Sequence, residues 1–214
     1  MTRARGRDTR TRQRLLDVAT RLFADRGFKH VTVRVICRDA RANVASVNYH
    51  FRDKMGLYRE VLEQTAQIVT KMTAEAVRAG EGLPPADRLR EYVRVNVEHI
   101  FRAGPRNQLQ QLMHRELQEP TAMLASIIDQ VWKPRFAYLG SIVGDLVSLP
   151  PDDPRVIRSA ISIHAQVVMF KPSPAHERMD RAVKRVFVPD QIADHIIAFS
   201  LAGLAAYTPE APGA

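Results

Sequence analysis

Apolar side chains recur at spacings of three and four residues near the start of the chain. Within residues 11–26 this stripe consists of Leu15, Leu16, Ala19, Leu22 and Phe23. Such spacing predicts an amphipathic helix with one buried face. Gly27 follows directly, and a glycine at this point favours the left-handed conformation that ends many helices.

A second, shorter helix is predicted after a brief connection. Thr32 is a suitable N-cap for a helix that runs to about Ala40. Within it, Val35 and Ile36 are available for burial.

A third helix is predicted over residues 44–51, with Asn43 as its N-cap. Val47 and Phe51 share one face of it, because residues four apart are neighbours on a helix surface. Only a few residues separate the second and third helices. Two short helices joined in this way form a helix-turn-helix, whose later helix is the candidate for the major groove of DNA.

The rest of the chain shows helical patterns separated by proline-rich breaks. Helices are predicted over residues 54–79, 86–103, 107–118, 120–148, 154–170 and 190–206. Pro134 should kink the fourth of these, and residues 175–186 form a charged segment of ambiguous structure. No segment has the pattern of a strand. The sequence therefore predicts an all-α fold, in which a three-helix DNA-binding domain precedes a larger helical domain.

Apolar stripes on three of these helices identify the expected core positions. The stripes are Leu57, Val61, Leu62, Ile68, Val69 and Met72 on the first helix, Ile157, Ala160, Ile161, His164 and Val168 on the fifth, and Ile192, Ile196, Phe199 and Leu204 on the last. We expect these side chains to face the interior.

Charge is distributed unevenly along the chain. The formal net charge is +9. Residues 1–60 contain 15 Lys and Arg against 6 Asp and Glu, whereas residues 61–214 contain 17 of each class. A basic module joined to a neutral body is the electrostatic pattern of a protein that binds a polyanion. A solubilising basic tail would explain residues 3–14 alone, but not the helix-turn-helix that follows.

Composition excludes several other classes of protein. The single cysteine, Cys37, allows neither an intramolecular disulfide nor a cysteine zinc cluster. No apolar run approaches the roughly 20 residues of a membrane span, and the N-terminus lacks the apolar core of a secretory signal. The seven histidines include no pair four residues apart, so no metal site is predicted. Without a phosphate-binding glycine loop or a nucleophile elbow, we expect a cytoplasmic protein that is not an enzyme and has no cofactor.

Three segments in order resemble the TetR family of transcriptional regulators. They are RLLDVATRLFADRGF, TVRVICRDA and ANVASVNYHFRDKMGLY. In that family a Tyr-His-Phe segment ends the recognition helix and a nearby Lys begins the long fourth helix. Here the matching residues are Tyr49, His50, Phe51 and Lys54. The resemblance covers about 50 residues and implies a helix-turn-helix DNA-binding domain over residues 1–53, with an effector-binding and dimerisation domain over 54–214.

Two positions depart from the family pattern. Arg41 lies in the turn where the family usually has Gly. A non-glycine residue with positive φ is uncommon, so either the turn holds Arg in that conformation or its geometry differs. Asn48 stands before Tyr49, where the family often has an aromatic residue. Asn can form two hydrogen bonds with an adenine edge, which predicts a different operator sequence.

The resemblance assigns roles to residues of the basic module. Val44, Ala45, Ser46 and Asn48 are expected in the groove, where small side chains allow close approach and contact thymine methyls. Phosphate contacts, which set register rather than sequence, are expected from Tyr49, His50 and Lys54. Thr32 can bind phosphate at a helix N-terminus, and Arg34 is placed to read guanine. Packing of His50 against the fourth helix is the alternative. Arg3, Arg5, Arg7 and Arg10 are expected to add salt-dependent attraction, with entry into the adjacent minor groove as the alternative.

The chain after the basic module also resembles a subgroup of this family. The runs HRELQEPTAM and LPPDDPRV, together with NYHF, are similar to the CecR-type subgroup of TetR regulators. In the family the last two long helices pair with those of a second copy. Small side chains at residues 198, 200, 202, 203, 205 and 206 would allow such close packing, with packing inside one chain as the alternative. A dimer would also present two recognition helices to palindromic half-sites about 34–36 Å apart.

A small-molecule pocket is implied by the family rather than by the residue pattern. The candidate effector-binding residues are Tyr92, His99, Met113, His114, Trp132, Phe136 and His164. Aromatic and Met side chains at helical spacing are more often core than ligand-binding, so each of them has an ordinary packing role as its alternative.

The sequence thus predicts a dimeric repressor that leaves its double-stranded DNA operator when a small molecule binds the larger domain. A ligand-independent or partner-controlled DNA-binding protein on the same fold remains the alternative. Neither the operator nor the effector can be named from the sequence.

Overall fold

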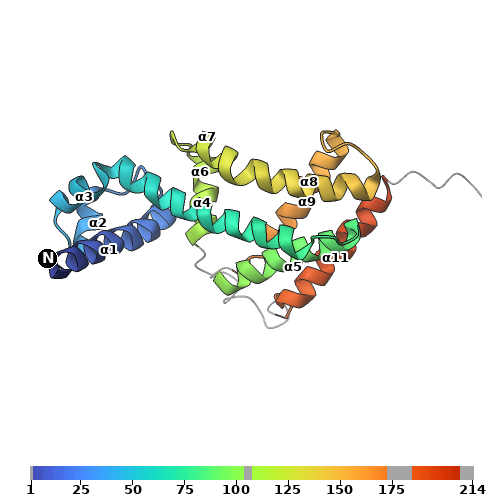
Figure 1. Ribbon diagram of the computed structural model, residues 1–214, viewed down its shortest axis with the longest axis horizontal. Coiled ribbons are helices and arrows are strands. Elements are labelled where there is room, and N and C mark those ends of the chain that lie inside the picture. The colour runs from blue at the N-terminus through green and yellow to red at the C-terminus, as the bar shows by residue number, and fades with distance from the viewer. Residues whose placement is uncertain (1, 104–107, 173–184, 208–214) are drawn as a thin grey trace, which may run out of the picture. The chain divides into compact units, whose positions relative to one another are not determined.

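A computed structural model describes residues 2–103, 108–172 and 185–207, and every regular element in these residues is a helix (Figure 1). The predicted all-α fold is confirmed. The chain divides into two compact units. The first unit comprises Met1–Ile68 and Gln108–Ile128, and the second comprises Val69–Asn107 and Asp129–Ala214.

The first unit is built around a long N-terminal helix. The predicted stripe of Leu15, Leu16 and Phe23 is fully buried, and Gly27 ends the helix with a φ of 79°. The helix begins nine residues earlier than the predicted position 11. The helices of this unit are α1 (Thr2–Arg26), α2 (Val33–Asp39), α3 (Val44–Phe51), the first part of α4 (Lys54–Ala79), α6 (Gln108–Gln118) and α7 (Leu124–Ile127).

Side-chain caps define α2 and α3 as predicted. Thr32 Oγ1 accepts a hydrogen bond from the Val35 N–H at 3.3 Å, and Asn43 Oδ1 accepts from the Ala45 N–H at 3.0 Å. Between these helices Arg41 has a φ of 49°. The Arg41 and Ala42 N–H groups donate to the carbonyls of residues 38 and 37, which is the bonding pattern of a Schellman turn. The turn therefore holds Arg in the conformation that usually favours Gly.

The junction between α3 and α4 depends on a glycine. A Cβ at Gly56 would lie 1.9 Å from the Phe51 carbonyl oxygen, so no larger residue fits. Asp53 Oδ1 accepts a hydrogen bond from the Gly56 N–H at 2.7 Å and thereby caps α4. Close backbone approach and this cap together fix the end of α3 against the start of α4.

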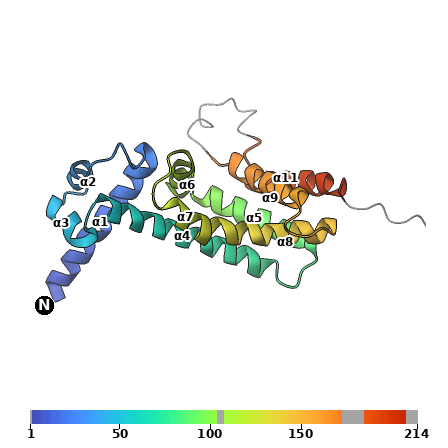
Figure 2. The same cartoon turned by 90° about the horizontal axis from the view of Figure 1, so that it is seen from above.

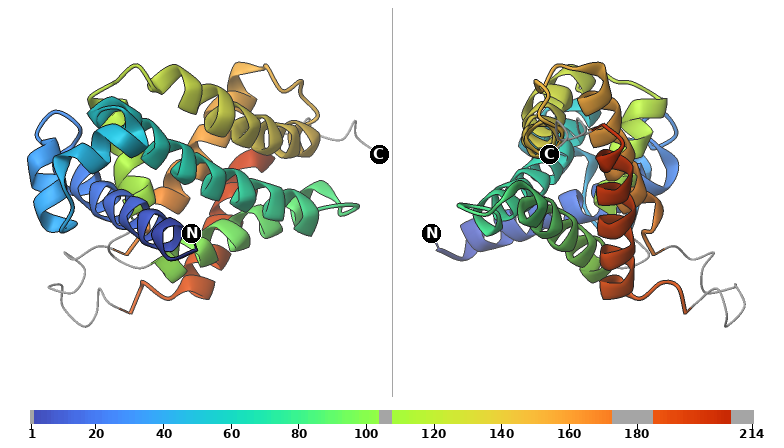
Figure 3. Two further views of the ribbon diagram at one scale, coloured as in Figure 1. Left: turned by 60° about the vertical axis from the view of Figure 1, so that its left-hand side comes forward. Right: turned by 90° about the vertical axis from the view of Figure 1, so that its right-hand side faces the viewer.

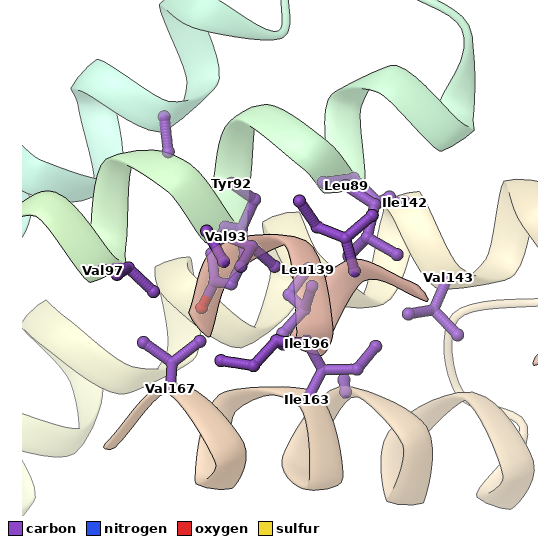
Figure 4. Packing of buried hydrophobic residues seen from close by; sticks show 14 of the residues in the cluster. Leu89, Tyr92, Val93, Val97, Leu139, Ile142, Val143, Ile163, Val167 and Ile196 are labelled. Carbon is purple, nitrogen blue, oxygen red and sulfur yellow. The ribbon is translucent and has the colours of Figure 1, made fainter. Parts of the chain in front are cut away.

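The second unit packs four long helices around one apolar core. These are α5 (Pro85–Ala103), α8 (Lys133–Val147), α9 (Pro154–Met169) and α11 (Pro189–Ala205), with the end of α4. Figure 2 shows α9 and α11 side by side, and Figure 3 shows α11 alongside both α5 and α9. In Figure 4 Leu89 of α5, Leu139 of α8, Ile163 of α9 and Ile196 of α11 meet in the core.

The helix predicted over 120–148 is present over residues 124–147, but it is not α-helical throughout. Within it, α7 leads into a π-helical segment, η1 (Ile128–Trp132), which is followed by α8. Pro134 lies in the first turn of α8, directly after this segment. Because proline has no N–H, an α-helical bond from residue 134 back to residue 130 cannot form. The wider π-helical turn accommodates this gap.

Some predicted core positions face outward. On α9 the buried face is formed by Val156, Ala160, Ile163 and Val167, so the predicted stripe is rotated by about one residue. Local periodicity allowed either face, and packing against α8 and α11 selected one of them. The exposed members of the predicted stripes are Ile68, Ile157, Ile161 and Phe199.

The charged segment of ambiguous structure comprises residues 175–186. Residues 175–184 lie outside the described part of the chain.

Candidate nucleic-acid interface and effector site

Helix α3 presents two distinct faces. Val47 is fully buried and Phe51 is 4% exposed, so they anchor the helix to the first unit as predicted. On the opposite face Tyr49 is 77% exposed and Val44 is 42% exposed. Ala45 and Asn48 are exposed as well, and Ser46 is half-buried. An anchored helix with one free face is the arrangement that enters a major groove.

Three of the predicted DNA-contact residues flank this face. Thr32 and Arg34 are exposed at the start of α2. The Thr32 hydroxyl oxygen already caps the helix, so its hydrogen remains available as a donor. Lys54 begins α4, and its Nζ lies 4.2 Å from the centre of the Phe28 ring. Partial burial there lowers the Lys54 pKa, and the cation–π contact holds the ammonium group in place.

His50 has a partner within the first unit. Its side chain is 7% exposed, and its Nε2 lies 3.3 Å from Asp8 Oδ1 on α1. The ring also packs edge-on against Tyr49, with centroids 4.9 Å apart. His50 is therefore packed within the first unit, but its partners are Asp8 of α1 and Tyr49 rather than the fourth helix of the alternative. The predicted phosphate contact would require the ring to turn away from Asp8 and stays a prediction.

The N-terminal arginines belong to a helix. Because α1 begins at Thr2, Arg3, Arg5, Arg7 and Arg10 lie along its first turns rather than in an extended tail. Their role in salt-dependent attraction does not require an extended chain, so it stays a prediction.

Three of the predicted effector residues come together in the second unit. The Tyr92 hydroxyl lies 3.3 Å from His164 Nδ1, and the Phe136 ring packs edge-on against the His164 ring at 5.3 Å. Tyr92 is fully buried, whereas Phe136 and His164 are partly buried. These three residues come from α5, α8 and α9.

The other four predicted effector residues do not all belong to this group. His99 is paired with Glu75 on α4. This bond is the largest cause that lowers the pKa of Glu75. Met113 and the exposed His114 belong to the first unit. Trp132 is half-buried at the end of η1. The set therefore does not form one cluster.

A buried polar group beside Tyr92 was not predicted. Arg135 is 7% exposed, and its Nε donates to Thr73 Oγ1 at 3.3 Å. No described residue accepts from Arg135 Nη2 or donates to Asn96 Oδ1, although both atoms are buried. The other end of the Asn96 amide donates to the Tyr92 carbonyl oxygen at 2.7 Å.

Burial dominates the electrostatics of this group. It raises the pKa of Tyr92 and lowers the pKa of Arg135. Burial, with a further contribution from the Arg135 charge, lowers the pKa of His164 to about 4. At neutral pH the imidazole is therefore uncharged, and the guanidinium keeps its charge because Arg is not deprotonated in proteins.

A signal for Arg135 was present in the sequence. Arg135 lies four residues after Val131 and four before Leu139, both of which are buried. A charged residue at that spacing is placed on the apolar face of a helix. Asn96, four residues after Tyr92 on α5, follows the same rule.

Comparison with known proteins identifies the family. Residues 15–61 match the tetR family of bacterial regulatory proteins. Residues 85–204, more than half of the chain, match the C-terminal domain of the HTH-type transcriptional dual regulator CecR. The chain belongs to the TetR family of transcriptional regulators. The resemblance to both the family and its CecR-type subgroup is confirmed.

Curated relatives of this TetR-family regulator include repressors. The probable acrEF/envCD operon repressor of Escherichia coli strain K12 is 25% identical over 123 residues, which is 58% of this chain and 56% of that protein. The HTH-type transcriptional regulator AcrR of Shigella flexneri is 32% identical over 65 residues, 30% of each chain. The matched part of the chain thus spans 56% of the length of the Escherichia coli relative and 30% of the length of AcrR.

Solved structures share the fold. HlyIIR, a hemolysin II transcriptional regulator, aligns with a TM-score of 0.64 at 20% identity over 90% of this chain and 97% of its own. AibR, in complex with isovaleryl coenzyme A and operator DNA, aligns with a TM-score of 0.67 at 19% identity over 88% of this chain and 97% of its own. At these identities the likeness shows the fold of a TetR regulator.

Two further observations, on metal sites and on membrane spans, concern the described residues alone. Among them, no three His, Cys, Asp or Glu side chains gather in a way that could hold a metal ion. None of the helices described combines the length and hydropathy that a membrane span requires.

Proposed function

We propose that this TetR regulator is a cytoplasmic homodimeric repressor that binds a palindromic operator through α3. Binding of a small molecule in the second unit releases it from DNA. Residues 1–53 form the DNA-binding part, and residues 54–214 bind the effector and the second copy. Repression is the activity named for the curated relative of Escherichia coli.

The exposed face of α3 carries the DNA-binding part of the proposal. Val47 and Phe51 are buried below it, whereas Tyr49 is the most exposed aromatic side chain of the first unit. The surplus of positive charge in this module favours association with the phosphate backbone. Asn48, beside Tyr49 on this face, supplies an amide suited to adenine.

Unpartnered apolar faces support the homodimer. Ile157 and Ile161 on α9 are 45% and 52% exposed, and Phe199 on α11 is 64% exposed. A Cβ at Gly203 would meet no atom within 4 Å, so a second helix can approach closely there. Helices α9 and α11 pack against each other. Together they offer a continuous surface that a two-fold partner can cover.

Replacing Ile161 with Glu tests the homodimer. The carboxylate would be buried without a partner at the centre of the proposed surface. We expect the variant to sediment as a monomer in analytical ultracentrifugation while its helical circular dichroism is retained. Exposed Val77→Glu on α4 is the matched control. Unchanged sedimentation of the Ile161 variant would refute this surface.

Helix α4 supports coupling between effector and operator. Its residues 54–68 belong to the first unit and its residues 69–79 to the second. A ligand that prefers one arrangement of this helix lowers operator affinity by the difference in its binding free energy, typically about 1–3 kcal/mol. The structure of AibR with both isovaleryl coenzyme A and operator DNA is a precedent on the same fold.

Binding to the DNA that flanks its own gene tests the function. We expect tight, footprinted binding by the wild type, and weaker binding at higher salt as counterions compete. Tyr49→Ala should lose affinity by at least about tenfold. Tyr207→Ala, at another exposed tyrosine, should bind as the wild type does.

Two other outcomes have clear meanings. Equal, weak binding of all three proteins to flanking and unrelated DNA would reduce the basic module to a non-specific polyanion surface. Specific binding that no small molecule weakens would support the ligand-independent alternative on the same fold.

A further inference from the structure

Arg135 is a buried charge that the described residues leave incompletely paired. The residue is 7% exposed, yet its one hydrogen bond within this part of the chain is the 3.3 Å contact to Thr73. No carboxylate of the described residues lies within ion-pair distance of it, and its Nη2 has no acceptor there. Burying an unpaired charge costs several kcal/mol. An apolar residue of similar size would be more favourable for folding alone.

The same unit contains an arginine that is fully engaged. Arg88 donates to Asp145 Oδ2 at 2.7 Å and to Ser141 Oγ at 3.1 Å. The fold therefore can supply partners for a guanidinium where one has a structural role. The difference indicates that Arg135 takes its missing acceptor from a bound molecule rather than from the described residues.

The surroundings of Arg135 are suited to a ligand. Its charge acts on both Tyr92 and His164, whose polar atoms lie 3.3 Å apart. Phe136 packs edge-on against His164 and belongs to the rim of the apolar core. The π-helical segment η1 ends directly before α8, and such segments occur frequently at functional sites.

We propose that Arg135 binds the carboxylate of an apolar small molecule, with the Tyr92 hydroxyl and the His164 imidazole beside the head group. This inference rests on the proposed function, because it names the chemical class of the effector. The planar guanidinium matches a carboxylate with two parallel hydrogen bonds. The apolar remainder of the ligand replaces contacts within the core of the second unit.

Charge balance favours a carboxylate over a phosphate. One guanidinium neutralises one carboxylate, which leaves no net charge in the buried site. A phosphate monoester carries about −1.5 to −2 at neutral pH. It would leave an uncompensated negative charge, because His164 is neutral and, of the described residues, Arg135 is the one cation that acts on Tyr92 and His164.

Ligand binding to the full chain tests this assignment. The probes are butanoate, hexanoate, octanoate and decanoate, each with its matched alcohol and with octyl phosphate for comparison. Trp132 is the single tryptophan and lies three residues before Arg135, so its fluorescence reports on the site. We expect at least one carboxylate to shift this fluorescence and to raise the Tm, with an affinity at least about tenfold above that of its alcohol.

Two matched variants separate a binding role from a structural one. Arg135→Met should lose at least about tenfold in affinity for the carboxylate, while its Tm without ligand equals or exceeds that of the wild type. Arg88→Met should keep the carboxylate affinity and lower the Tm, because its partners are left unpaired. Arg135→Lys keeps the positive charge but cannot form two parallel hydrogen bonds, so it should bind the carboxylate with intermediate affinity.

Several results would overturn the proposal. The first is that no carboxylate binds with higher affinity than its matched alcohol. The second is that octyl phosphate binds more tightly than octanoate. The third is a large loss of Tm in Arg135→Met. The readouts do not involve DNA. A wild type that binds carboxylates but no flanking DNA would refute the proposed function alone, whereas operator binding without carboxylate binding would refute this inference alone.

Discussion

Each unit of this TetR regulator buries one charged side chain among the described residues. The two side chains differ in how completely they are hydrogen-bonded. Glu116 in the first unit is 1% exposed, and Arg135 in the second is 7% exposed. Glu116 Oε2 accepts from the Tyr58 hydroxyl at 2.7 Å. Its Oε1 accepts from the Thr121 N–H at 2.8 Å and the Thr121 hydroxyl at 2.6 Å. Arg135 has one long hydrogen bond.

The comparison distinguishes a charge that is fully paired from one that the described residues leave partly unpaired. Glu116 joins α6 to Tyr58 of α4 and to the turn after α6, so its desolvation is offset by three hydrogen bonds. The same carboxylate and burial raise the pKa of the Tyr58 hydroxyl well above its ordinary value, so it remains a donor. Among the described residues Arg135 lacks such compensation, which is consistent with its proposed role in binding a carboxylate.

Removing Glu116 should produce the largest effect. Glu116→Ala leaves the buried Tyr58 hydroxyl and the partly buried Thr121 N–H without their acceptor. We expect a loss of about 3–4 kcal/mol in the free energy of unfolding, measured with urea. Exposed Glu63→Ala on α4 should change it by less than about 0.5 kcal/mol. A loss below about 1 kcal/mol for Glu116→Ala would show that its network is not structural.

Acid should weaken the second unit through His164. Its pKa is about 4 in the folded chain and 6.5 in the unfolded chain, so the unfolded state binds the proton more tightly. The stability from the neutral imidazole is complete above pH 6.5 and is lost as the pH falls toward 4, by up to about 3 kcal/mol.

The variant His164→Gln isolates this contribution. Urea unfolding between pH 7 and pH 4 should show a shallower decline for the variant than for the wild type, since the other titrating groups are shared. Parallel pH profiles for the two proteins would contradict the assignment to His164.

Arg115 should have a smaller effect than its neighbour Glu116. Its Nε and Nη2 donate to the carbonyl oxygens of Ala24 and Asp25 at 2.7 and 2.5 Å, which satisfies the C-terminal end of α1. Arg115→Met should cost about 1–2 kcal/mol in the free energy of unfolding. Exposed Arg59→Met serves as the control, and equal values for both variants would show that this link contributes nothing.

Asn96 should show the smallest effect, because its bonding is incomplete. Asn96→Leu loses the bond to the Tyr92 carbonyl but also removes a buried oxygen without a donor. We expect the free energy of unfolding to change by less than about 1 kcal/mol. A loss above about 2 kcal/mol would reveal a partner for Asn96 Oδ1 and weaken the contrast with Glu116.

Local rules predicted much of the first unit. Thr32 and Asn43 cap the helices that their side chains suggested, and the buried pair on α3 follows from its spacing. Each depends on residues within one helical turn, so the sequence contains the whole interaction. The start of α1 was missed because its first turns carry no apolar stripe.

Long-range packing limited prediction in the second unit. On α9 the apolar residues occupy more than half of the circumference, so periodicity alone did not distinguish the core face from the exposed face of Ile157 and Ile161. The candidate effector residues were selected by their chemical type. This criterion selected Tyr92 and His164, which lie together, but also Met113 and His114, which belong to the other unit.

The sequence by itself determined the family, the helical fold and the recognition helix, because capping, spacing and net charge are local or additive properties. Only the tertiary structure decided that Glu116 is fully paired and that Arg135 is not. Both residues follow the same pattern, a charge on an apolar stripe. Whether such a charge is satisfied depends on atoms distant in sequence: Tyr58 lies 58 residues before Glu116, and Thr73 lies 62 before Arg135.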